Sequence, residues 1–171
     1  MSSVFAGRYT AQTDEPFVVF LIGMRINRLR AVHKWLPVAM AMPPMIAELM
    51  QHPEKGMMGG QSFISWRTTL MIQYWRSFEH LEAFARNPND PHLPAWQRFN
   101  KAVGNNGVVG IYHETYKVQA GQYEAIYGNM PLFGLAAATQ HQPISAGRYQ
   151  TARRRLGGEN EPAVPLAEVS R

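Results

Sequence analysis

The chain has 171 residues, which suits one domain with room for an extension. Its hydrophobic fraction of 46% is ordinary for a globular protein, and its formal net charge is +5. The lack of cysteine excludes disulfides, thiolate metal ligands and a cysteine nucleophile. Residues 1–10 lack the basic and apolar segments of a secretory signal, and the apolar run 17–24 is too short to cross a bilayer. We therefore expect a cytoplasmic protein that makes no membrane contact.

The last quarter of the chain carries much of the positive charge, including Arg153, Arg154 and Arg155. This cluster predicts either a solvated basic tail or a contact with phosphate, and we favour the solvated tail. Residues 140–171 are polar and basic, with glycine and proline towards the end, which predicts disorder over about the last 15 residues. The folded domain is accordingly expected over residues 1–139, with no nucleic acid as a partner.

Regular periodicity organises the chain as far as residue 118. The apolar run 17–26 predicts a strand, and apolar residues at helical spacing over 33–51 predict a helix that Pro43 and Pro44 interrupt. The remaining predictions are strands over 59–67 and 68–77, a helical region in two pieces over 78–103, and a strand over 108–118. The order β-α-β-β-α-β predicts an α+β domain with a ferredoxin-like antiparallel sheet.

The first predicted strand is apolar on both faces. One face carries Phe17, Val19 and Leu21, and the other carries Val18, Phe20 and Ile22. Helices cover only one face of such a sheet, so the second face must meet another apolar surface. A second copy of the chain is the simplest candidate, which predicts a homodimeric α/β barrel with a cavity between each sheet and its own helices.

The last strand carries polar side chains on both faces. Tyr112, Glu114 and Tyr116 share one face, and Ile111, His113 and Thr115 share the other. A histidine in an apolar cavity can serve as base, acid or iron ligand, and a buried glutamate has a raised pKa and can move protons. Either side chain can instead pair with backbone or with an arginine, so the sequence leaves open which set enters the cavity.

Residues 123–131 bring Glu124, Tyr127 and Asn129 close together after this strand. The three side chains can close a cavity mouth around a substrate, or they can fasten an arm of the dimer. Trp75 and Trp96 are further candidates for substrate-binding walls. The sequence lacks G-x-G-x-x-G, P-loop, G-x-S-x-G and H-E-x-x-H motifs, so it supports no nucleotide cofactor bound by these routes.

Two stretches resemble a bacterial and fungal family of monooxygenase-like proteins. They are Tyr112-His113-Glu114-Thr115-Tyr116 and Tyr123-Glu124-x-Ile126-Tyr127-x-Asn129-Met130-Pro131. The family includes a small monooxygenase of the fumagillin pathway and is similar to the antibiotic-biosynthesis monooxygenases and other dimeric α/β-barrel proteins, among them haem-dependent aldoxime dehydratases. The resemblance spans roughly residues 17–135.

The resemblance implies oxygenation of an apolar organic molecule without a cofactor. His113 or Glu114 would then accept a proton, with Tyr116, Tyr127 and Asn129 orienting the substrate. Relatives that bind haem imply the alternative that His113 is the metal ligand, since no thiolate is present. A non-catalytic dimer that binds a small ligand is the third interpretation.

Overall fold

The computed structural model describes residues 3–145 and 150–158. Two compact units make up the chain, one from the described parts of residues 1–15 and 119–171, the other from residues 16–118. The expected boundary between residues 139 and 140 therefore does not separate the two units. The disorder expected at the end of the chain falls mostly on residues 159–171, which lie outside the described part.

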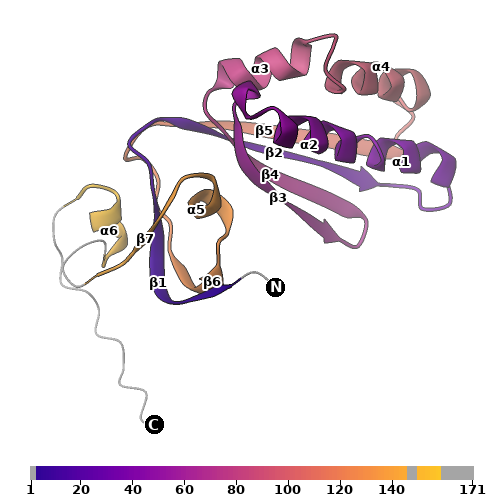
Figure 1. The fold of residues 1–171 in the computed structure, drawn as a ribbon. Coiled ribbons are helices and arrows are strands. Elements are labelled where there is room, and N and C mark those ends of the chain that lie inside the picture. Colours follow the sequence, from indigo (N-terminus) through magenta and orange to yellow (C-terminus); the bar gives the residue numbers. More distant parts are fainter. Residues whose placement is uncertain (1–2, 146–149, 159–171) are drawn as a thin grey trace. The chain divides into compact units, whose positions relative to one another are not determined.

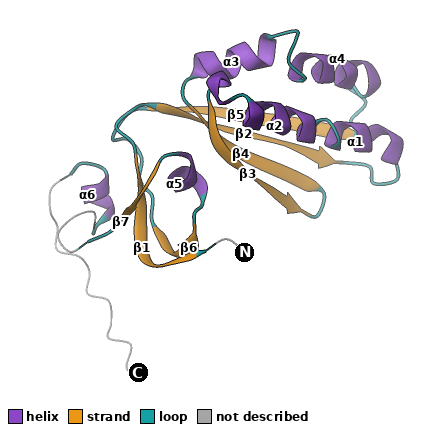
Figure 2. Cartoon of the chain, viewed as in Figure 1, coloured by secondary structure: helices purple, strands orange, loops and turns teal. Residues whose placement is uncertain are grey.

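The second unit has the predicted ferredoxin-like order (Figures 1 and 2). It contains β2 (Phe17–Ile26), α1 (Val32–Ala39), α2 (Met42–Gln51), η1 (Pro53–Lys55), β3 (Met57–Ser65), β4 (Thr68–Trp75), α3 (Phe78–Arg86), α4 (His92–Ala102) and β5 (Val109–Val118). Its four strands lie in the order β3-β4-β2-β5, and all neighbours are antiparallel. The α+β fold expected from the sequence is confirmed. The helices lie on one side of the sheet (Figure 1).

Local sequence explains where these helices begin. Pro43 and Pro44 fall in the first turn of α2, where a missing N–H costs nothing, so the expected helix divides into α1 and α2. Ser77 caps α3 by accepting a hydrogen bond from the backbone N–H of His80 at 3.3 Å. Trp66 adopts a positive φ of 49° in the short turn that joins β3 to β4.

The core of this unit forms two clusters between the helices and the sheet. One surrounds Trp75 and contains Val18 from the start of β2, and the other contains Met24 from near the end of β2. Phe20 and Ile22 lie between them along the same face of the strand and are only half-buried. The middle of this face therefore stays open for a site.

The first unit was not predicted from the sequence. It contains β1 (Val4–Gln12), β6 (Tyr127–Pro131), α5 (Gly134–Ala138), β7 (Gln140–Pro143) and α6 (Ala152–Arg155). The strands form an antiparallel sheet in the order β6-β1-β7. Residues 140–143, which we expected in the tail, are thus an edge strand of this sheet. None of the described helices in either unit is long and apolar enough to cross a bilayer.

Candidate functional site

A cavity of about 1450 Å³ lies between the helices and the sheet of the second unit. It exceeds the usual range of small-molecule sites, about 300–1,000 Å³, and so has room for a large ligand. Its walls are mostly apolar and rich in methionine, including Met42, Met45, Met50 and Met71. Thioether side chains are flexible and polarisable, so these walls can adapt to ligands of different shape.

The floor of the cavity comes from one face of β2 and β5. Phe20 and Ile22 of β2 pair in register with Thr115 and His113 of β5, and all four line the cavity. Because side chains alternate along a strand, this pairing fixes which residues of β5 point towards the helices. The structure thereby shows that the set with His113 and Thr115, and not the set with Glu114 and Tyr116, faces the cavity.

His113 is the ionisable side chain on this floor. Its ring lies 5.7 Å from the ring of Phe20, between centroids, and the residue is exposed to the cavity space. Within the described chain, neither ring nitrogen takes part in a hydrogen bond or ion pair. A neutral imidazole with both nitrogens available can accept a proton from a bound ligand. Thr115 adds a hydroxyl on the same face, two residues along the strand.

Glu114 and Tyr116, the other predicted catalytic residues, lie on the opposite face of β5. The Tyr116 hydroxyl donates a hydrogen bond to Oε2 of Glu114, and both residues are exposed. This bond to the carboxylate raises the pKa of Tyr116 above its usual value. The burial that would have made Glu114 a proton carrier is absent, and neither side chain lines the cavity.

Tyr112 also lies on this opposite face and explains a glycine in the central strand. Its hydroxyl crosses Gly23 and donates to the backbone carbonyl of Thr69 at 3.1 Å. A Cβ on Gly23 would lie 2.6 Å from that hydroxyl oxygen and 2.0 Å from the Thr69 carbonyl oxygen. Only glycine leaves room for this crossing.

The two predicted tryptophans have different positions. Trp96 on α4 lines the cavity, is 45% exposed, and stacks on Phe99 with 5.6 Å between ring centroids. Trp75 is 1% exposed and donates from Nε1 to Oε1 of Gln73 at 2.9 Å. It borders only a small adjoining void of about 40 Å³, so we assign Trp75 to the core.

Glu124, Tyr127 and Asn129 belong to the first unit, whereas every cavity-lining residue belongs to the second. Each has a structural partner. Glu124 accepts from Nε of Arg155 at 2.5 Å, the Tyr127 hydroxyl accepts from the backbone N–H of Ala136 at 3.3 Å, and Oδ1 of Asn129 accepts from the N–H of Gly7 at 2.9 Å.

These partners favour the structural interpretation of the three residues. Burial raises the pKa of Tyr127, and Asn129 tolerates its positive φ of 52° better than most residues do. The Arg155 side chain is only 7% exposed in its ion pair with Glu124. Arg155 is thus anchored within the first unit and is not part of a solvated tail.

Sequence reasoning missed the basic side chains that line the cavity from the helices. They are Lys34 on α1, Arg86 on α3, and Arg98 and Lys101 on α4. Glu82 is the acidic lining residue, and its carboxylate lies 3.3 Å from Nη1 of Arg86. In the sequence, the position of Arg98 and Lys101 relative to the apolar face of α4 was the available signal. Helical spacing alone does not tell whether such residues lie at the rim of a cavity or on open surface.

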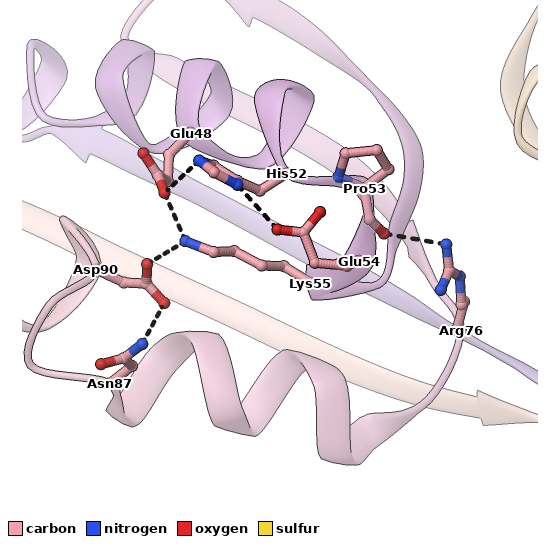
Figure 3. A network of polar contacts seen from close by, with 8 residues as sticks. All are labelled: Glu48, His52, Pro53, Glu54, Lys55, Arg76, Asn87 and Asp90. Atoms are coloured by element: carbon pink, nitrogen blue, oxygen red, sulfur yellow. Dashed lines mark hydrogen bonds and ion pairs between the residues drawn. The ribbon is translucent and has the colours of Figure 1, made fainter.

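A polar network joins η1 to its neighbours without touching the cavity (Figure 3). The ammonium group of Lys55 contacts Glu48 on α2 at 2.5 Å and also Asp90 in the α3–α4 loop. Asp90 is 4% exposed and accepts a second hydrogen bond from Asn87 at 3.0 Å. Burial by itself would lower the pKa of Lys55, but the two carboxylates outweigh it and raise the pKa. We assign this network to stability.

The described residues include no group of three or more acidic or histidine side chains that would hold a metal ion. Haem iron needs only one axial ligand from the protein, and His113 on the sheet side of the cavity could supply it. The roof histidine His92 already donates from Nδ1 to the carbonyl of Ala85 at 2.9 Å.

The family model described as monooxygenase af470-like matches residues 17–135, about two thirds of the chain. The chain belongs to the monooxygenase af470-like family. Monooxygenase af470 of Aspergillus fumigatus is 35% identical over 65 residues, which are 38% of this chain and 22% of that protein. The match thus spans about a fifth of the length of this curated relative. Membership confirms the resemblance seen in the sequence.

Two solved structures show the same fold at low identity. An aldoxime dehydratase solved with butyraldoxime is 17% identical, with a TM-score of 0.60 over 84% of this chain and 45% of that chain. A second aldoxime dehydratase structure is 19% identical, with a TM-score of 0.58 over 85% and 45%. The chain thus spans less than half of these proteins. The cofactor-independent oxygenase SnoaB of Streptomyces nogalater is more distant, with 11% identity and a TM-score of 0.42 over 60% and 93%.

Proposed function

We propose that this chain is a monooxygenase-like enzyme that oxidises an apolar organic molecule bound between its sheet and its helices. Membership of the monooxygenase af470-like family supports the reaction class. The observation that carries the proposal is His113, an ionisable side chain on the floor of a large apolar cavity, whose ring nitrogens have no hydrogen-bond partner among the described residues. Molecular oxygen is the oxidant, and no nucleotide cofactor takes part.

His113 acts as the proton acceptor in this scheme. It removes a proton from an activated C–H or O–H group of the substrate, and the resulting anion passes electrons to oxygen. For a substrate CH₂ group, the balanced change is CH₂ + O₂ → C=O + H₂O. The apolar walls exclude water from the anion, and the Thr115 hydroxyl is placed to hold a polar atom of the substrate next to His113.

Oxygen uptake with electron-rich aromatic and terpenoid compounds tests this role. On any compound that the native protein oxidises, His113→Ala should lower the rate by about 10²-fold or more, because a positioned base contributes that much. Glu114→Gln changes the neighbouring residue on the opposite face and should keep the native rate. Full activity in His113→Ala would rule out His113 as the base.

Haem is the alternative suggested by the sequence, and we propose no step through it. An absorption spectrum before and after adding one equivalent of haem distinguishes His113 as a proton acceptor from His113 as an iron ligand. The proposal expects no Soret band beyond that of free haem. A sharp band that His113→Ala abolishes would replace the proposed base by an iron ligand.

We also propose that two copies pair through the face of the sheet that the helices leave open. Leu21 of β2 pairs in register with Ile72 of β4 on this face, and neither lines the cavity. Tyr74 and Val19 form the next pair on the same face. Large apolar side chains on an open sheet face are typical of a surface that packs against another sheet. The polar side chains of this face, Tyr112, Glu114 and Tyr116, lie on the edge strand β5.

A further inference from the structure

We propose that the molecule bound in the cavity carries a carboxylate, which Arg98 and Lys101 hold at the rim while the apolar part reaches His113. This inference rests on the proposed function and names the class of substrate: an apolar organic acid. The charged side chains that line the cavity are mainly positive.

Arg98 and Lys101 are three residues apart on α4 and so lie next to each other on the helix surface. Both line the cavity and both are exposed. Within the part of the chain that the structure describes, neither side chain takes part in a hydrogen bond or ion pair. Two neighbouring cations with free donors are suited to a bidentate anion such as a carboxylate.

The rest of the lining does not neutralise this pair. Lys34 on α1 adds a third cation to the wall of the same cavity. The acidic lining residue Glu82 pairs with Arg86, so this pair adds no net charge. A cavity that is apolar inside and positive at its edge favours a ligand with an apolar body and an anionic end.

The arrangement along the cavity fits one molecule that contacts both regions. Phe99 of α4 and Ile111 of β5 pack around the same core cluster, so the last turns of α4 lie over the start of β5. His113 is two residues further along the strand, about 7 Å from Ile111. An acid group near Arg98 and Lys101 would therefore leave the attached apolar chain above His113 and Phe20.

A matched pair of ligands tests the inference on the full chain. Isothermal titration calorimetry compares decanoate with 1-decanol, which has the same chain length and no charge. We expect decanoate to bind about tenfold more tightly, and this preference should shrink as salt is added. The double variant Arg98→Gln with Lys101→Gln should lose the preference and leave the affinity for 1-decanol unchanged.

The control removes two positive charges that do not line the cavity. Arg28→Gln with Arg30→Gln changes two exposed arginines of the β2–α1 loop and should keep the preference for decanoate. Equal affinities in the native protein, or a preference that survives in the Arg98 and Lys101 variant, would overturn the inference while leaving the cavity as a binding site. Binding of neither ligand would overturn the inference, and the oxygen-uptake experiment described above decides the proposed function separately.

Discussion

Neighbouring residues of β5 point to opposite faces of the sheet, so His113 and Glu114 meet different surroundings. His113 faces the apolar cavity, and no residue in the described part of the chain bonds to its ring nitrogens, whereas Glu114 accepts a hydrogen bond from Tyr116 on the other face. The residue types alone suggested both as proton acceptors. Their environments separate them, and only His113 is placed to touch a ligand in the cavity.

Glu114→Gln should lower the pKa of Tyr116 towards its ordinary value, because the carboxylate that holds the phenolic proton is removed. The alkaline titration of tyrosinate absorbance measures this change. The chain has seven tyrosines, so the curve of Tyr116→Phe is needed to identify the contribution of Tyr116. An unchanged titration in Glu114→Gln would show that the Tyr116–Glu114 bond does not persist in solution.

Gly23→Ala should destabilise the protein by at least about 2 kcal/mol, because the new methyl group overlaps the Thr69 carbonyl and the Tyr112 hydroxyl. Gly110→Ala is the matched control in β5, since its Cβ would come no closer than 3.7 Å to another residue. That variant should be as stable as the native protein or slightly more so. Urea denaturation compares the two, and equal stabilities would contradict the crossing of Tyr112 over Gly23.

At the scale of elements, partly buried polar contacts hold the short helix η1 against its neighbours (Figure 3). Lys55 connects η1 with α2 through Glu48 and with the α3–α4 loop through Asp90. Both α2 and α3 contribute walls to the cavity, as Met45 and Leu81 show. The network therefore helps to position the helices around the site without contacting a ligand.

Lys55→Met should cost about 2–4 kcal/mol, because it leaves the buried carboxylate of Asp90 without its cation. Arg86→Met is the control, since it breaks an exposed pair with Glu82 and should cost less than about 0.5 kcal/mol. Chemical denaturation near neutral pH measures both. A loss for Lys55→Met no larger than that for Arg86→Met would contradict a structural role for the network.

The stability from Lys55 should also depend on pH. Its pKa is raised in the folded protein, so its contribution is complete below the unfolded value of about 10.4 and is lost as the pH rises through the folded pKa. Denaturation at increasingly alkaline pH should bring the native protein and Lys55→Met closer together in stability. A difference that stays constant above pH about 11 would contradict this assignment.

Patterning predicted the elements of the second unit because their apolar residues repeat at strand or helix spacing. It missed β1, whose first five residues are all exposed and whose partner β6 is more than a hundred residues away in the chain. The face on which His113 lies was also beyond prediction, because both faces of β5 carry polar residues. The register of β5 against β2, which pairs His113 with Ile22, places His113 on the cavity face, and this register is set only in the folded sheet.

At the scale of the whole molecule, the chain consists of two units with separate sheets, and the cavity belongs to one of them. The sheet of that unit presents large apolar side chains, such as Leu21 and Ile72, on the face that its helices do not cover. The first unit combines segments that precede and follow the second unit in the chain, and Arg155 is held in it by its contact with Glu124.

Sedimentation at micromolar concentration should show a homodimer. Ile72→Glu, on the face away from the cavity, should shift the protein to monomers, because a charge cannot be buried in an apolar contact without a partner. Ile64→Glu replaces an isoleucine of β3 that is 83% exposed and should remain dimeric. Circular dichroism confirms that both variants are folded, and a stable native monomer would exclude the pairing.

The most direct test of the site is the nuclear magnetic resonance of the histidine rings during titration with decanoate and 1-decanol. The chain has six histidines, and His113→Ala identifies the signals of His113. We expect the His113 ring signals to shift with bound ligand, while those of His52, which pairs with Glu48 outside the cavity, stay unchanged. Ligand binding measured by calorimetry without any shift at His113 would contradict the placement of the substrate above this residue.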